Sequence, residues 1–177
     1  QYVIIDYIEC EDNPVLRNVW YIAAWSHEVA ARSILPRKLL GEDVVLFRND
    51  DGTVSAMADY CPHRYAPLSL GCNEGDGIRC LYHGLKFGAA GQCIHAPAGG
   101  RLPAKLKTQV YRAVEKNKFI WIWMGDPDLC HERDIPTLPQ MDDDKWCYVP
   151  RHLTYAANYK LLMDNRSEEH TSALQSH

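Results

Sequence analysis

The amino-acid sequence predicts a mainly β protein built from antiparallel strands. Short runs rich in β-branched and aromatic residues occur at 19–25, 43–48, 108–114 and 119–124, as is typical of strands. Turn-forming residues separate neighbouring runs, so adjacent strands are expected to pair as hairpins. Glycine and cysteine gather elsewhere: 8 of the 11 glycines and 4 of the 7 cysteines lie within 61–100, which is therefore expected to consist mainly of loops.

Local signals define the elements that precede the loop region. Asp51-Gly52 follows the second strand run and indicates a tight hairpin turn. A short helix is predicted at 26–31, with Ser26 as its N-cap. The segment 34–36, Ile-Leu-Pro, is expected to end this helix, because the residue before a proline disfavours the helical conformation.

The elements that follow the loop region change character along the chain. The last two strand runs flank residues 115–118 and are expected to form another hairpin. Residues 126–145 are rich in proline and aspartate and lack periodicity, which predicts a linker. Beyond it, a strand is predicted at 146–155 and a helix at 158–163. These two elements would begin a second domain.

Composition excludes several classes of protein. The chain of 177 residues is long enough for one domain with a piece of another, and 46% apolar residues suffice for a core. With a net charge of −4 the chain has no excess of basic residues to bind phosphate groups, so no nucleic-acid partner is predicted. No apolar run reaches the roughly 18 residues of a membrane span, so no membrane partner is predicted either. We expect a cytoplasmic protein. Gln1 in place of an initial methionine suggests a fragment.

Two pairs of metal-ligating residues stand out. Cys61 and His63 form one pair, Cys80 and His83 form the other, and the 16 residues 64–79 separate them. A structural zinc site usually groups its two cysteines in one pair and its two histidines in the other. Interleaved pairs instead suit a two-iron cluster, in which two thiolates hold one iron and two imidazoles hold the other.

This pattern resembles the Rieske [2Fe–2S] motif of non-haem iron oxygenases. It reads Cys-x-His-x16-Cys-x2-His, within CPHRYAPLSLG and CLYHGLKF. The stretch from Asn18 to Gly125 also resembles the amino-terminal domain of oxygenase α subunits, above all those similar to vanillate O-demethylase, which acts on methoxylated aromatic acids. One departure is Gly88, where an aspartate is common in the family. Further residues stand at family-like places: Pro62, Arg64, Pro67, Gly71, Gly77 and Gly84.

The resemblance implies a fold, a cofactor and a set of ligands. The fold would be an antiparallel Rieske domain with a small cluster-binding subdomain, followed by the start of an α+β catalytic domain. Cys61 and Cys80 would bind one iron of a [2Fe–2S] cluster, and His63 and His83 the other. Cys72 and Cys93 are expected to be buried free thiols, because their positions do not match the disulfide of respiratory-chain Rieske proteins.

The resemblance also implies partners. An NAD(P)H-dependent reductase or a ferredoxin would supply electrons, and the cluster would pass them to a mononuclear Fe(II) in a neighbouring subunit of a homo-oligomer, a trimer. An aromatic substrate would bind in the catalytic domain. The expected division of the chain is an N-terminal extension (1–16), the Rieske domain (17–125), a linker (126–145), the start of the catalytic domain (146–165) and a tail outside the family pattern (166–177).

The catalytic iron site is not expected in this chain. In the resembled group the helix that begins at Asn158 continues to an aspartate and two histidines that bind the mononuclear iron. In this register their places hold Glu168, Thr171 and Ser176, so the facial triad is missing and we expect the chain to be inactive alone. The tail, with one change at Ala173, resembles a translated sequencing adapter, which would make the chain a truncated reading frame.

Two other functions stay open at this stage. One is a stand-alone Rieske-type ferredoxin, an electron carrier without a catalytic domain. Such carriers have about 100 residues, whereas this chain has a long lead before Cys61 and a linker that leads to Asn158. The other is a structural module stabilised by zinc, which the visible colour of the purified protein would exclude.

Overall fold

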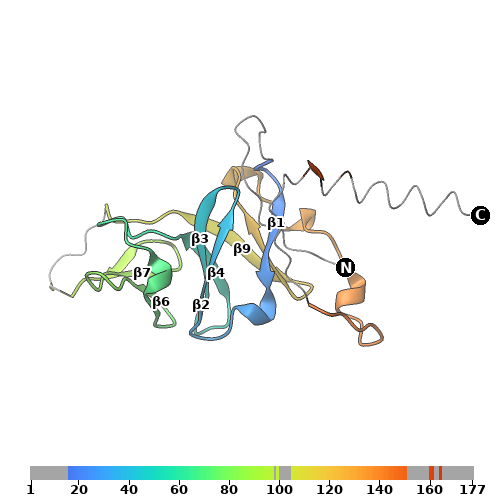
Figure 1. Cartoon of the computed structure of the whole chain (residues 1–177), viewed down its shortest axis with the longest axis horizontal. Helices are drawn as coiled ribbons and strands as arrows, with labels where there is room; N and C mark the ends of the chain where they lie inside the picture. The colour runs from blue at the N-terminus through green and yellow to red at the C-terminus, as the bar shows by residue number, and fades with distance from the viewer. Residues whose placement is uncertain (1–15, 98, 100–104, 151–159, 162–163, 165–177) are drawn as a thin grey trace, which may run out of the picture. The chain divides into compact units, whose positions relative to one another are not determined.

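The computed structural model describes residues 16–97, 99, 105–150, 160–161 and 164 (Figure 1). The chain divides into two units, 16–149 and a second unit made of both ends of the chain. In the second unit Lys160 and Leu161 are helical, as predicted. The tail and three sequence positions considered for a catalytic iron lie outside the described residues: Glu168, Thr171 and Ser176.

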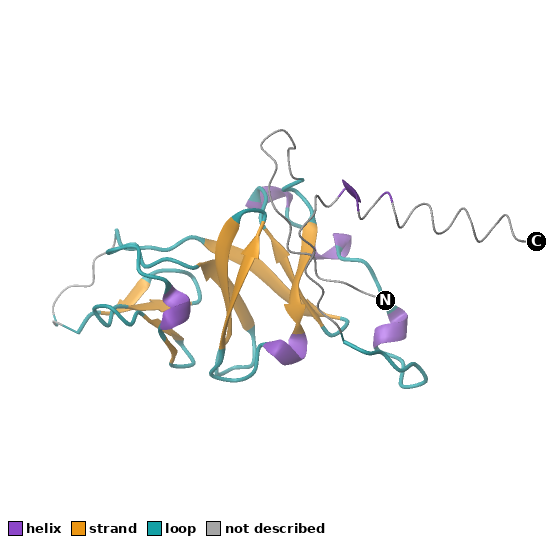
Figure 2. Ribbon diagram, viewed as in Figure 1, coloured by secondary structure: helices purple, strands orange, loops and turns teal. Residues whose placement is uncertain are grey.

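The first unit contains a six-stranded antiparallel sheet, here called the large sheet (Figures 1 and 2). Its strand order is β1-β10-β9-β4-β3-β2. The mainly β, antiparallel fold class predicted from the sequence is confirmed. The strands are β1 (Trp20–Trp25), β2 (Ile34–Leu39), β3 (Glu42–Arg48), β4 (Val54–Ala58), β9 (Val110–Lys116) and β10 (Phe119–Trp123).

Both predicted hairpins are present. Between β3 and β4, Gly52 adopts a left-handed φ of 87°, and the Asp51 carboxylate accepts a hydrogen bond from the Thr53 N–H at 2.9 Å. Between β9 and β10 the turn is limited to Asn117 and Lys118, both with positive φ, as a tight two-residue hairpin requires. The strand β9 therefore continues two residues further than predicted.

The predicted early helix is wrong in type and extent. A single 3-10 turn, η1 (Ser26–Glu28), replaces it, and the Glu28 carboxylate accepts the Trp25 N–H at 2.8 Å where Ser26 was expected to cap. The segment expected to end the helix is the start of β2. Pro36 is tolerated there because β2 lies at the edge of the sheet and its missing N–H breaks no inner ladder.

A smaller four-stranded sheet is inserted between β4 and β9 (Figures 1 and 2). Its strands are two or three residues long, which is too short to show an alternating pattern, and they lie inside the stretch predicted as loops. Buried residues of this sheet share one core with Val45, Phe47 and Met57 of the large sheet. The elements are η2 (Leu68–Leu70), β5 (Cys72–Asn73), β6 (Gly77–Arg79), β7 (Lys86–Gly88) and β8 (Cys93–His95).

Arg48, at the end of β3, binds both the segment between β1 and β2 and the strand β9. Its guanidinium donates to the Val29 carbonyl at 2.8 Å and to both carboxylate oxygens of Glu115 at 2.8 and 3.2 Å. This matters because β4 and β9 pair over two residues of each strand, Ala56 with Tyr111 and Met57 with Val110. Toward the β3–β4 turn the ladder ends at Ala56 and Tyr111, and the Arg48–Glu115 ion pair links β3 to β9 on that side.

The segment predicted as a linker packs against the large sheet. It forms three short 3-10 turns, η3 (Pro127–Leu129), η4 (Glu132–Asp134) and η5 (Pro139–Met141). The side chains of Ile135 and Met141 are buried. Downstream, the strand predicted at 146–155 is not formed over 146–150, and the rest of it lies outside the described residues. The domain boundaries of the sequence analysis stay a prediction.

The buried position of Ile135 yields a stability test. Ile135→Ala should lower the free energy of unfolding by about 3 kcal/mol, because it removes three buried carbon atoms from a site that is 2% exposed. Urea unfolding followed by tryptophan fluorescence checks this through the midpoint. Leu129→Ala, in the same segment but half exposed, should leave the midpoint unchanged. Equal midpoints for both variants would show that 126–145 contributes nothing to the fold.

Candidate metal centre

The two cysteines of the ligand pairs lie next to each other in the shared core. Cys61 and Cys80 are each 2% exposed and belong to the apolar cluster that joins the two sheets. Burial raises the pKa of the Cys61 thiol, the neighbouring Cys80 adds to this effect, and the backbone N–H groups of His63 and Arg64 oppose it. A bound metal cation would favour the thiolate form at such a site.

The two histidines of the ligand pairs form a second, exposed pair. The ring centroids of His63 and His83 are 4.8 Å apart, with the rings at 65° in an edge-on arrangement. The ring of Tyr82 lies against His83 at 3.9 Å between centroids. Residues that alternate along the sequence are therefore grouped by type in the fold: the two cysteines are buried and the two histidines are exposed.

Two loops of the same local shape carry these four residues. In ligand loop 1 (61–66) and ligand loop 2 (80–85), the cysteine N–H donates to the carbonyl five residues later, at 2.8 Å in both loops. The cysteine carbonyl accepts from the N–H four residues later, at 2.7 Å in loop 1 and 3.0 Å in loop 2. The histidine is the third residue of loop 1 and the fourth of loop 2. This offset accounts for the unequal Cys–His spacing in the sequence.

Each ligand loop requires one residue with positive φ at its fifth position. In loop 2 this residue is Gly84, with φ of 70°, and a Cβ there would lie 2.7 Å from the Pro97 side chain. In loop 1 it is Tyr65, with φ of 56°, a conformation that is strained for a bulky residue. The Tyr65 side chain is 77% exposed, and its ring approaches Tyr60 at 5.8 Å between centroids.

Each ligand loop is anchored differently. The Asp59 carboxylate, two residues before Cys61, accepts from the Ser69 N–H at 2.7 Å and from its hydroxyl at 2.5 Å. On the other loop, Arg79 binds both carboxylate oxygens of Glu74, at 2.6 and 3.0 Å, and donates to the Gly84 carbonyl at 3.3 Å. The sequence analysis did not single out these anchors, because charges spaced by five residues in a strand pair give no distinctive pattern.

A salt-bridge network extends from Glu74. Lys86 pairs with Glu74 at 2.9 Å and also with Asp76. Hydrogen bonds from Arg79 and then Lys86 lower the pKa of Glu74 to about 2. The carboxylate is therefore ionised at any working pH. The Lys86 side chain is 12% exposed, and its ammonium group is held by these two carboxylates.

The predicted state of the other two cysteines in the loop region is correct for one and wrong in part for the other. Both Cys72 and Cys93 are free thiols. Cys93 is buried as expected, whereas Cys72 is exposed, because it begins the edge strand β5 with its side chain on the open face.

The donor set fits a two-metal cluster better than a single ion. Within the described ranges, no group of three or more histidine, cysteine, aspartate or glutamate side chains is placed to hold one metal ion. A structural zinc site needs four such ligands around one centre. Two thiols and two imidazoles in separate, adjacent pairs match the mixed ligation of a Rieske cluster, with two cysteines on one iron and two histidines on the other.

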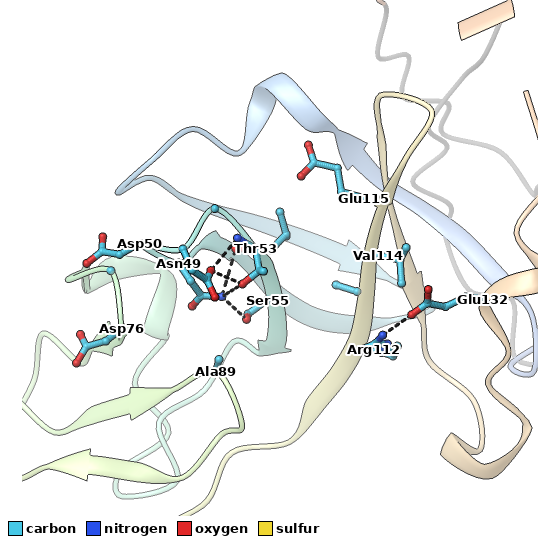
Figure 3. A pocket seen from close by; sticks show the side chains of 15 residues that line it. Asn49, Asp50, Thr53, Ser55, Asp76, Ala89, Arg112, Val114, Glu115 and Glu132 are labelled. Atoms are coloured by element: carbon cyan, nitrogen blue, oxygen red, sulfur yellow. Dashed lines mark hydrogen bonds and ion pairs between the residues drawn. The ribbon is translucent and has the colours of Figure 1, made fainter. Parts of the chain in front are cut away.

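A separate cleft of about 970 Å³ lies where β4 and β9 diverge (Figure 3). The residues that line it come from the β3–β4 turn, the start of β4, the β5–β6 turn, the turn after β7, β9 and η4, and none belongs to a ligand loop. Among its charged groups, Glu132 pairs with Arg112 (Figure 3), Glu115 with Arg48, Asp50 with Arg32 and Asp76 with Lys86. The Asp51 carboxylate accepts hydrogen bonds from the N–H and hydroxyl of Thr53. None of the four candidate metal ligands therefore lines this cleft.

A search of the described helices for a membrane span found none that is sufficiently long and apolar.

Comparison with known proteins identifies a family and relatives for this chain. The profile of the Rieske [2Fe-2S] domain matches residues 19–111. The toluene-4-sulfonate monooxygenase system iron-sulfur subunit TsaM1 of Comamonas testosteroni is 45% identical over 150 residues, which cover 85% of this chain and 43% of that protein. The vanillate O-demethylase oxygenase subunit of Pseudomonas sp. strain HR199 is 36% identical over 149 residues, or 84% of this chain and 42% of its own length.

A solved structure shows the same relationship. The crystal structure of apo dicamba monooxygenase superimposes with a TM-score of 0.69 and 43% sequence identity, over 72% of this chain and 40% of that one. The chain thus spans less than half the length of these relatives. The matched region holds both ligand loops and the large sheet as far as β9, and on this evidence the chain belongs to the Rieske [2Fe–2S] domain family.

Proposed function

We propose that Cys61 and Cys80 hold one iron, and His63 and His83 the other, of a Rieske [2Fe–2S] cluster that serves electron transfer in an oxygenase or O-demethylase subunit. The observation that carries the proposal is the buried thiol pair beside the exposed imidazole pair, on two loops of matching shape. A cluster bound there would supply one-electron transfer.

The surroundings of the cysteine pair and of the histidine pair would serve such a cluster in different ways. The apolar core keeps water away from the Cys61 and Cys80 sulfurs, and the N–H groups of His63 and Arg64 are directed at the Cys61 sulfur. The imidazoles face the surface and so offer the shortest route for an electron. Neutral imidazoles in place of two thiolates also raise the potential, to roughly −150 to +300 mV from about −400 mV for an all-cysteine cluster.

The longer relatives are the basis on which we infer the electron donor, the substrate and the assembly of the protein. Their names describe an iron-sulfur subunit of a monooxygenase system and an oxygenase subunit. We therefore infer a reductase or ferredoxin as electron donor, drawing on NAD(P)H. A mononuclear Fe(II), an aromatic substrate and assembly into a homotrimer would be properties of the full-length protein. Residues 17–125 would form its Rieske domain.

The two alternative functions have less support. A stand-alone ferredoxin would not need the segment 126–145, which here packs against the large sheet, and the relatives are oxygenase subunits. A zinc module usually groups its two cysteines in one pair and its two histidines in the other, whereas here each pair holds one of each.

Cluster assembly tests the proposal directly. Anaerobic reconstitution of the chain with iron and sulfide should yield two irons and two labile sulfides per chain. The reduced protein should show the low average g-value of a cluster with mixed cysteine and histidine ligands in electron paramagnetic resonance. The Cys61→Ala variant provides the matched negative control. A protein that holds one zinc and no labile sulfide would disprove the assignment.

The role of His83 can be tested through the midpoint potential. His83→Cys, if it retains a cluster, should have a lower potential, because an anionic thiolate replaces a neutral imidazole and disfavours an added electron. Protein-film voltammetry measures the shift. His95→Cys, an exposed histidine outside both ligand loops, is the control and should leave the potential unchanged. A potential at or above that of the parent would contradict His83 as a ligand.

The chain as given should transfer electrons but not oxidise substrates. It should accept electrons from a suitable reductase, and added Fe(II) should not start turnover, because Glu168, Thr171 and Ser176 cannot form a two-histidine, one-carboxylate site. The comparison is with a chimera in which 166–177 is replaced by the downstream sequence of a relative. Oxygen uptake coupled to product formation by the original chain would overturn this expectation.

A further inference from the structure

Ligand loop 2 lies between two cations that the proposed function does not use. Arg79 immediately precedes Cys80, and Lys86 immediately follows the last residue of the loop. Both are held by carboxylates of the β5–β6 turn: Arg79 by Glu74, and Lys86 by Glu74 and Asp76. We refer to these four residues as the loop 2 charge cluster. Its formal charges sum to zero, and Glu74 is the partner that its two cations share.

Arg79 connects this charge cluster to the ligand loop itself. One arm of its guanidinium forms the paired contact with Glu74, at 2.6 and 3.0 Å, and another donates to the Gly84 carbonyl at 3.3 Å. Gly84 follows His83 and has the positive φ that closes the loop. The planar fork of Arg79 is therefore fixed at one end by a carboxylate and orients the loop backbone at the other.

Loop 1 has no equivalent of this arrangement among its described contacts. Its anchor joins the Asp59 carboxylate to the N–H and hydroxyl of Ser69, without a cation. The positions of loop 1 that correspond to Arg79 and Lys86 are Tyr60 and Pro67. Since the two loops share one backbone pattern, the charges next to loop 2 are not needed to form that pattern. They call for a separate explanation.

We propose that Arg79 is a positioning residue for ligand loop 2, and that the Glu74–Arg79 pair adjusts the reduction potential of the cluster on that loop. This inference rests on the proposed function, since it presumes the cluster. An added electron makes the cluster more negative, so a nearby positive charge stabilises the reduced form and a nearby negative charge destabilises it. In the native chain the charges balance.

Removing either partner of the Glu74–Arg79 pair distinguishes an electrostatic effect on the midpoint potential from a structural effect of the lost ion pair. Glu74→Gln removes a negative charge and leaves a net positive charge beside the loop, so the midpoint potential should rise. Arg79→Gln removes a positive charge and should lower it. Both variants break the same ion pair, so a purely structural role would shift both potentials in the same direction. Because Glu74 has a pKa of about 2, its charge is present throughout the working range.

The experiment uses the reconstituted full chain and measures midpoint potentials by redox titration with visible circular dichroism. The expected result is shifts of opposite sign for the two single variants and a potential close to that of the parent for the double variant Glu74→Gln/Arg79→Gln. Glu115→Gln is the matched control: it breaks a similar two-contact arginine pair with Arg48, whose hydrogen bonds go to the large sheet and its turns. It should leave the potential unchanged.

A conservative variant tests the positioning role. Arg79→Lys keeps the charge but loses the fork, so its potential should match that of the parent while its electron paramagnetic resonance signal broadens and it loses the cluster faster. If Arg79→Gln fails to hold a cluster, Glu74→Gln and Arg79→Lys still decide the outcome. Shifts of the same sign, or no shift, would overturn this inference alone. A parent chain that assembles no cluster would contradict the proposed function instead.

Discussion

Two thiols placed side by side in a shared apolar core are the constraint on which the rest of this structure depends. Cys61 and Cys80 come from loops that follow different sheets, so they meet only if both sheets close over one cluster of side chains. Val45 and Phe47 from the large sheet and Ile78 from the small one supply that contact. Loss of this packing would separate the sulfurs even if both loops kept their local hydrogen bonds.

The surface position of the histidines follows from the same packing. Once the first residue of each loop is buried, the tight turn carries the next three residues outward, where His63 and His83 meet edge to edge. The exposed ring of Tyr82 lies against that of His83.

The elements that could be predicted from the sequence are those for which a local sequence pattern is typical of the structure. The alternating run at Phe119–Trp123 and the spacing of the cysteine and histidine pairs are of this kind. Sequence-based prediction failed where tertiary contacts decide. Pro36 lies in β2, an edge strand that is formed by pairing with β3. The strands of the small sheet are too short to show an alternating pattern. The anchors Glu74 and Asp59 depend on distances across loops, which spacing along the chain does not reveal.

The short pairing between β4 and β9 has a consequence for the architecture as a whole. Met57 and Val110 face each other across this ladder, so the chain leaves the large sheet and returns to it at almost one point. Everything between them, both ligand loops included, forms an insertion with adjacent ends, the arrangement in which whole segments are most readily exchanged between proteins. Transfer of this insertion to another sheet would therefore require only the same two strand ends and a matching apolar face.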